Sequence, residues 1–181
     1  MGIFRSLANS LRRFGRDRDG MAASEFALIT PVLITLYFGV TELTDALVVN
    51  SRVTRVASTA ADLVAQDISI TDAEMANIFS ALDTIMFPYP SDETSIVISS
   101  LIDAGNGTVK VAWSEAHNGS QRAANSLVDI PSGLVPAGGS VIYAEVSHEY
   151  SSPAGHLIYE TITMSDEFFV RPRRVAKVSR N

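Results

Sequence analysis

The sequence predicts an α+β fold, with two helices first and a largely antiparallel sheet of about four strands after them. An apolar run near the N-terminus continues into a segment with apolar residues at helical spacing, which predicts one long helix. Residues 71–74 read TDAE, a capping motif that predicts the start of a second helix. From residue 94 onward polar and apolar residues alternate between turn-forming segments, which predicts strands.

Composition and charge limit the class of protein. The 181 residues suffice for one domain and an N-terminal appendage, and 46% hydrophobic residues exclude disorder throughout. Cysteine is absent, which excludes a disulfide framework and thiolate metal sites. The net charge of −6 is uneven, because residues 1–20 carry +3, residues 171–181 carry +5 and the residues between carry −14. An acidic body with short basic ends argues against a nucleic-acid binder.

The first long element begins as a membrane-spanning segment. Residues 21–41 carry one formal charge, Glu25, and as a helix they extend about 31 Å, enough for a bilayer core of about 30 Å. Arginines precede the segment, and Glu42 and Asp45 follow it. The positive-inside rule then places the basic leader, residues 1–20, in the cytoplasm and the chain after about residue 42 across the membrane.

Three interpretations of this segment compete. A secretory signal peptide needs a small-residue cleavage site after the apolar run, and FGVTELTDA fits this poorly. An uncleaved anchor leaves Glu25 unexplained, because a charge at a helix centre costs about 2.5–3.5 kcal/mol on insertion, and less near the interface. A cut between Gly20 and Met21 would make Glu25 the fifth residue of the mature chain and give Met21 an α-ammonium group.

The sequences GMAASEF and EFALITPVLITLYFGVTEL resemble the TadE-like family of the tight-adherence (Tad, or Flp) pilus machinery. The resemblance covers roughly residues 16–66 and, more weakly, the ending TMSDEFFVRPRR. It implies a prepilin that a membrane aspartic peptidase cuts between Gly20 and Met21, with Glu25 and Phe26 in recognition and assembly. In that family the glutamate can neutralise the terminal ammonium of a neighbouring subunit, which would explain a carboxylate at the edge of an apolar helix.

The resemblance also implies partners and a location. The chain is far longer than a major Flp pilin, and Phe26 replaces the tyrosine typical of those pilins, so an accessory pseudopilin is the closer match. The implied partners are the prepilin peptidase, other pseudopilins, the Flp pilin and the Tad inner-membrane platform, with no cofactor and no enzymatic activity. The implied location is the bacterial inner membrane, with a single pass and an extracytoplasmic C-terminal domain. The alternative is an uncleaved single-pass scaffold or sensor; an anchored hydrolase ranks third.

Beyond residue 41 the helix is expected to continue. Apolar residues recur at three- and four-residue spacing to about Gln66, without glycine or proline, which predicts an amphipathic extension that packs on the domain. Within the membrane segment, Pro31 removes one backbone hydrogen bond and is expected to kink the helix, either harmlessly or as a hinge. The chain thus divides into the leader (1–20), a transmembrane segment (21–41), an extracytoplasmic domain with the helical extension (42–170) and a basic tail (171–181).

The remaining elements follow from local signals. The capping box at Thr71–Glu74 predicts a helix over 72–86, which Pro88 and Pro90 end. The predicted strands are residues 94–102, 108–115, 140–150 and 157–170, the last with a break near 164–166. Residues 116–139 are expected to form a long loop with one helical turn near 121–126. The basic tail is expected to be frayed and solvated.

Catalytic signatures are not found in the sequence. His117, His148 and His156 lack metal-ligand spacing, and the strand position of His148 predicts a surface side chain. No nucleophile elbow, P-loop or dinucleotide fingerprint occurs. The sequence therefore favours a protein that acts through protein contacts.

Overall fold

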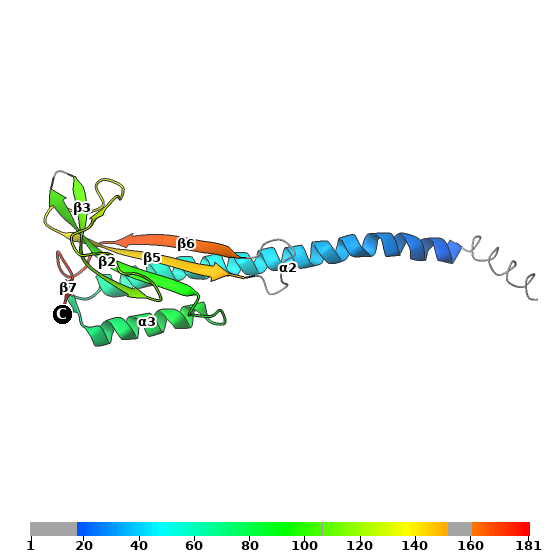
Figure 1. The fold of residues 1–181 in the computed structure, drawn as a ribbon, viewed down its shortest axis with the longest axis horizontal. Coiled ribbons are helices and arrows are strands. Elements are labelled where there is room, and N and C mark those ends of the chain that lie inside the picture. The colour runs from blue at the N-terminus through cyan, green and yellow to red at the C-terminus, as the bar shows by residue number, and fades with distance from the viewer. Residues whose placement is uncertain (1–17, 106, 152–160) are drawn as a thin grey trace, which may run out of the picture. The chain divides into compact units, whose positions relative to one another are not determined.

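The computed structural model describes residues 18–105, 107–151 and 161–181 (Figure 1). The chain forms two compact units that meet in sequence between Thr44 and Asp45. The N-terminal unit consists, in its described part, of the first half of one helix. Residues 45–181, here called the C-terminal domain, contain the second half of that helix, a second helix and all the strands.

Helix α2 (Arg18–Ala65) is 48 residues long and includes Pro31. It ends where Gln66 and Asp67 donate to the carbonyls of Leu63 and Val64, at 3.4 and 3.3 Å. The predicted continuation of the apolar segment into an amphipathic helix is therefore confirmed. Its stripe of small and β-branched residues is buried in the core of the C-terminal domain: Val49, Val53, Val56, Ala57, Ala60, Ala61, Val64 and Ala65.

Helix α3 (Asp72–Met86) begins and ends where the sequence predicts. The Thr71 hydroxyl accepts the Glu74 backbone N–H, while the Glu74 carboxylate accepts the Thr71 N–H at 2.8 Å. This reciprocal pair satisfies donors that the first helical turn leaves open. One face of α3 is buried, through Met75, Ile78, Phe79, Leu82 and Met86.

The main sheet has five antiparallel strands in the order β4-β3-β2-β5-β6. Their bounds are β2 (Thr94–Gly105), β3 (Thr108–His117), β4 (Leu127–Val128), β5 (Ser140–Tyr150) and β6 (Ile162–Val170). The α+β prediction is confirmed, and the added strand is the two-residue β4 within the predicted loop. The predicted helical turn near 121–126 is wrong: the chain turns at Asn125, with φ of 62°, and enters β4.

The break predicted in the last strand is also wrong. Strand β6 pairs with β5 without interruption, from Tyr150 opposite Ile162 to Ile142 opposite Val170. This ladder fixes residues 164–166 in extended backbone, because each lies opposite a residue of the long strand β5. Residues 157–160, the start of the predicted strand, lie outside the described residues.

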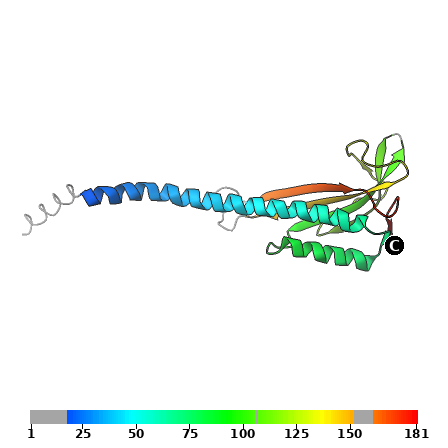
Figure 2. The same cartoon turned by 180° about the vertical axis from the view of Figure 1, so that it is seen from behind.

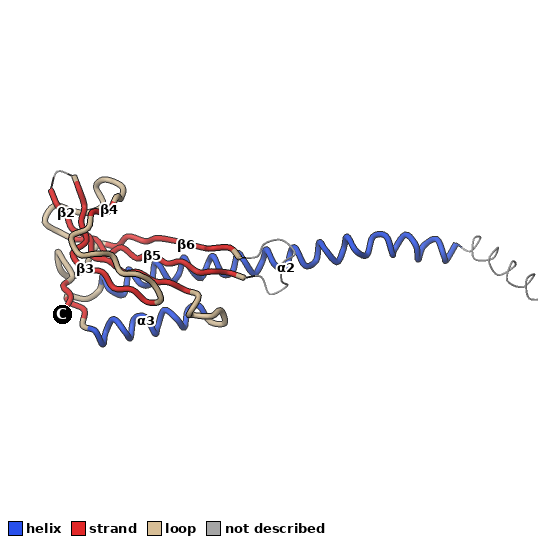
Figure 3. Tube along the Cα trace, viewed as in Figure 1, coloured by secondary structure: helices blue, strands red, loops and turns tan. Residues whose placement is uncertain are grey.

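The sheet separates two cores of unequal size. The second half of α2 and helix α3 pack on one face, where alternate residues of β5, Ile142, Ala144 and Val146, are buried with them (Figure 2). On the opposite face Leu101, Val111 and Tyr143 form a smaller cluster, against which Ile130 and Val135 of the long loop pack. Figure 3 shows this loop, which follows β3 and precedes β5 along the chain, lying against the sheet.

The C-terminal tail is ordered, contrary to the prediction of a frayed terminus. Strand β7 (Ser179–Arg180) pairs in parallel with β1 (Ser69–Ile70), the connection between the two helices. Val178 is 2% exposed, and its carbonyl accepts the indole N–H of Trp113 at 2.9 Å. The sequence-based expectation failed because it weighed the tail's basic charge and not the one apolar side chain that fills the core.

Arg180 is one of the charged residues that fix this tail. It is 15% exposed, and its guanidinium contacts the carboxylates of Glu115, at 3.0 Å, and Asp72 and donates to the Ile70 carbonyl at 3.0 Å. We expect Arg180→Ala to lower the free energy of unfolding by about 1–2 kcal/mol, since a buried charged donor is lost. Urea unfolding of the detergent-solubilised chain measures this. The exposed Arg174→Ala is the control, with an expected change below about 0.5 kcal/mol.

Candidate cleavage and assembly site

The residues predicted for cleavage and assembly lie together in the N-terminal turns of α2. Gly20 is exposed, Met21 is 62% exposed and Phe26 is 67% exposed. Met21 and Glu25 are four residues apart in a helix, so they share one face and are separated by about 6 Å along the axis. A protein that approached this face would meet the Gly20–Met21 peptide bond and the Glu25 carboxylate from one side.

Glu25 differs from the other polar residues of this segment. Five hydroxyls bond backbone carbonyls of their own helix: Ser24 to Met21, Thr30 to Phe26, Thr35 to Pro31, Thr41 to Phe38 and Thr44 to Val40, all at 2.7–2.9 Å. Such bonds let a hydroxyl enter an apolar environment without losing its partner. Glu25 has no hydrogen-bond or ion-pair partner among the described residues, so its carboxylate needs a partner from elsewhere in an apolar surrounding.

The helix has the composition of a membrane span. Among the described residues it is the one helix long and apolar enough to cross a bilayer, with a mean hydropathy of 1.7 over the best 18-residue window. Only 6% of that window is buried, whereas the core helix of a soluble protein is mostly buried. The observed helix therefore fits a single-pass membrane protein.

Pro31 lies on a shallow apolar groove along this span. Pro31, Thr35 and Gly39 follow one another at four-residue intervals, and Val32, Leu36, Val40 and Leu43 complete the lining. Proline has no N–H for the carbonyl of Ala27, four residues earlier. The helix nevertheless continues through this position. The kink expected at Pro31, either harmless or as a hinge, stays a prediction.

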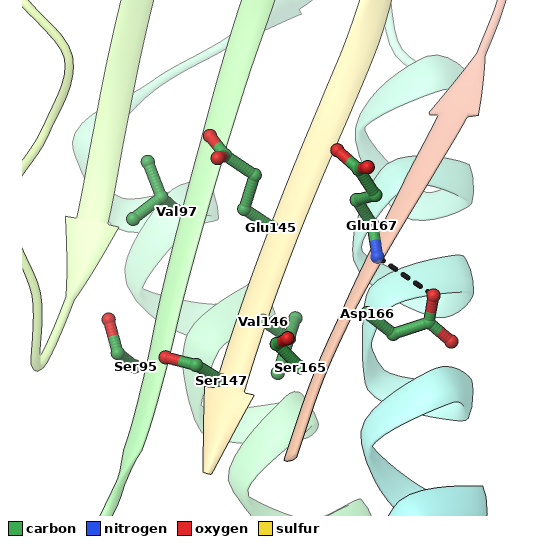
Figure 4. Close-up of a pocket in the computed structure, with 8 residues that line it drawn as sticks. All are labelled: Ser95, Val97, Glu145, Val146, Ser147, Ser165, Asp166 and Glu167. Carbon is green, nitrogen blue, oxygen red and sulfur yellow. Dashed lines mark hydrogen bonds between the residues drawn. The ribbon is translucent and has the colours of Figure 1, made fainter. Parts of the chain in front are cut away.

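A polar depression lies on the sheet face opposite the helices (Figure 4). Glu145 and Glu167 stand directly opposite each other on β5 and β6. Glu145 accepts two 2.6 Å hydrogen bonds from Arg122, and Glu167 accepts a short one from the Tyr143 hydroxyl. Both carboxylates are thus held by neighbours, and the Arg122 pair fastens the long loop to the sheet. In the described ranges no three His, Asp or Glu side chains are grouped as metal ligands.

A partly buried polar network, which the sequence analysis missed, lies at the C-terminal end of β5. The Asp45 carboxylate accepts the hydroxyls of Tyr89, at 2.6 Å, and Tyr150, at 2.9 Å. His148 is 1% exposed and its Nδ1 lies 2.9 Å from the Thr94 hydroxyl, so the predicted surface position is wrong. The period-two pattern contained the signal, because His148 shares its strand face with buried Val146 and Tyr150. His156 lies outside the described residues.

Burial of His148 predicts a pH dependence of stability. Desolvation lowers the pKa of His148, opposed by the nearby carboxylates of Glu93 and Glu149. The unfolded chain therefore binds this proton more readily. Neutral, buried His148 therefore contributes its full share to the free energy of unfolding above the unfolded pKa of about 6.5, and this share declines as the pH falls below that value. We expect urea unfolding of the solubilised chain to show less of this decline between pH 7.5 and 5.5 in His148→Asn than in the wild type. Equal pH dependence in the two proteins would contradict the assignment.

Comparison with known proteins finds a family match within helix α2. Residues 20–62 match the family described as TadE-like protein. No curated protein and no solved structure matches the chain. The match begins at Gly20, covers the whole apolar run and continues into the amphipathic half of α2. The chain therefore carries a TadE-like segment, which confirms the resemblance seen in the sequence.

Proposed function

We propose that this chain is a minor pseudopilin of the Tad (Flp) pilus machinery, made as a prepilin and cut between Gly20 and Met21. The observation that carries the proposal is the start of the TadE-like match at Gly20, with Glu25 five residues later on an exposed helix face. The protein acts through contacts with other subunits. The TadE-like family is a structural component of pilus assembly and is not known as an enzyme family.

The first step is removal of residues 1–20 by the prepilin peptidase. A peptidase needs the scissile bond in extended form, so the helix has to unwind at Gly20 and Met21. Gly20 lowers that cost, because glycine in a helix is about 1 kcal/mol less favourable than alanine.

The second step is the assembly of helices through Glu25. Cleavage places a positive α-ammonium on Met21 and makes Glu25 the fifth residue from the new N-terminus, where the helix dipole favours a negative charge. In a bundle of apolar helices the carboxylate and a neighbouring subunit's ammonium neutralise each other, whereas either charge alone would be costly. Phe26 adds an exposed apolar side chain beside that pair.

The proposed partners are the prepilin peptidase, other pseudopilins, the Flp pilin and the Tad inner-membrane platform. The distribution of charge supports an N-terminus in the cytoplasm, since five arginines precede the span and acidic residues follow it. The C-terminal domain is then extracytoplasmic.

The N-terminal mass of the chain tests the proposal. The protein is extracted from membranes of cells with an active prepilin peptidase and from cells without it. A chain that begins at Met21 is expected in the first case and one that begins at Met1 in the second. A chain that begins at Met1 in both would refute the pseudopilin and favour the uncleaved scaffold.

A further inference from the structure

One end of the C-terminal domain is tied to the residue that follows the apolar span. Asp45 is the first residue of the domain, and its carboxylate holds the hydroxyls of Tyr89 and Tyr150. The loop of residues 87–91, between α3 and β2, is therefore fixed beside Asp45. We call Asp45, Tyr150 and this loop the proximal end of the domain.

The length of chain between the span and Asp45 limits how far the proximal end can lie from a membrane. Four residues separate Thr41 from Asp45, which corresponds to about 6 Å in a helix and at most about 14 Å fully extended. The polar headgroup layers of a bilayer add about 10–15 Å in total to its hydrocarbon core. Whatever angle the two units take, a span that ends at Thr41 brings Asp45 close to the headgroups. This step rests on membrane insertion and not on the pilus role.

Exposed apolar side chains gather at the proximal end. In the described part of the C-terminal domain six large hydrophobic residues are exposed: Leu47, Val48, Ile68, Phe87, Leu127 and Phe168. Leu47 and Val48 follow Asp45 within one helical turn, and Phe87 begins the proximal loop. Phe87 is the most exposed of the six, at 75%, and Pro88 and Pro90 beside it are also exposed. Leu47 and Val48 thus follow Asp45 closely along the chain, and Phe87 belongs to the loop that Asp45 holds through Tyr89.

The backbone of this loop suits an interface with little water. Pro88 and Pro90 have no N–H, and the N–H of Tyr89 donates to the carbonyl of Met86 at 2.9 Å. The Ser91 carbonyl accepts the N–H of Thr94 at 3.0 Å and the side-chain amide of Asn118 at 2.9 Å. No backbone donor at positions 88–90 is left open, which lowers the cost of bringing the loop into a lipid interface.

We infer that the proximal loop inserts Phe87, flanked by Pro88 and Pro90, into the lipid–water interface of the leaflet where the span ends. Aromatic side chains are enriched at that depth. The exposed acidic residues Asp92 and Glu93 follow the loop, and the N–H of exposed Glu149 donates to the Glu93 carbonyl. The one nearby guanidinium among the described contacts, that of Arg52, lies over the Tyr89 ring and donates to the Ile85 carbonyl. The partner is therefore a zwitterionic lipid surface and not an anionic one. Insertion holds the C-terminal domain against the membrane through a second contact besides the span.

Spin labels on the full chain test the inference. The chain has no cysteine, so single variants Phe87→Cys and Leu127→Cys each take one nitroxide. Leu127 is the matched control: it is 71% exposed and lies on β4, toward the end of β2 that is remote from Thr94. In phosphatidylcholine nanodiscs we expect the ratio of oxygen to water-soluble nickel collisions to be several-fold higher at 87 than at 127. Equal ratios would overturn the inference.

Two further arms separate lipid from other partners. Replacing a third of the lipid with phosphatidylglycerol is expected to lower the ratio at 87, and a rise would overturn the proposed preference. Discs with one chain are expected to give the same ratio as discs with two. Protection that appears only with two chains, together with spin–spin broadening, would show a contact between copies and overturn lipid insertion. A nitroxide at Asp92→Cys leaves the loop itself unchanged. Its ratio of oxygen to nickel collisions is expected to fall when Phe87→Glu is added.

Discussion

Replacing Gly20 with alanine is expected to leave almost all of the chain uncut in cells that process the wild type completely. A prepilin peptidase that recognises this site accepts glycine before the scissile bond, and an alanine Cβ would occupy the space where the backbone must approach closely. Alanine also stabilises the helix at position 20 by about 1 kcal/mol, which opposes the unwinding that cleavage needs. The intact mass of the membrane-extracted chain gives the uncut fraction directly.

Gly39→Ala is the matched control for this substitution. Gly39 lies in the same helix, eight residues beyond Pro31, and the change has the same size and the same effect on helix propensity. We expect it to be processed like the wild type. If Gly20→Ala were processed as completely as Gly39→Ala, the peptidase would cut the chain at another bond. Glu25 would then not be the fifth residue of a mature chain.

The elements that the sequence predicts well are those with local causes. The bounds of α3 follow from the Thr71–Glu74 capping box at one end and from Pro88 at the other, and the structure reproduces both. The long helix follows from apolar spacing without a breaker. Each signal lies within a few residues of the structure it determines, so no tertiary information is needed.

The elements that the sequence analysis missed depend on contacts between distant residues. Strand β7 exists because Ser179 lies opposite Ser69, 110 residues earlier. Strand β4 is two residues held by Val109 and Lys110 of β3. Such short segments carry no period of their own, because pairing with a neighbour decides their conformation.

The candidate site is predictable to a greater extent than the fold around it. Gly20, Met21, Glu25 and Phe26 are consecutive or one helical turn apart, so their arrangement follows once the helix is known. The structure adds their exposure and the absence of a partner for Glu25 among the described residues. Cleavage and pairing remain predictions, since the ammonium is formed by a reaction and the neighbour is another molecule.

Replacing Glu25 with alanine is expected to leave cleavage largely intact and to reduce assembly at least tenfold, a loss of about 1.4 kcal/mol or more. The carboxylate is not at the scissile bond, so the peptidase still meets Gly20 and Met21. Once the ammonium forms in an apolar bundle, however, no opposite charge remains to neutralise it. N-terminal mass measures the first effect, and pilus yield from cells that carry only the variant measures the second.

A comparison of cut and uncut chains separates charge pairing from a general effect of the substitution. In lipid, we expect Glu25→Ala to weaken helix association of the cut chain, which begins at Met21. Helix association of the uncut chain, which begins at Met1, should be almost unchanged, because that chain has no ammonium at position 21. Acetylation of Met21 removes the same positive charge and should reproduce the loss with Glu25 in place. Equal weakening in the cut and uncut chains would mean that Glu25 acts through helix packing. Charge pairing would then not explain the carboxylate in this span, even if the chain is cut after Gly20.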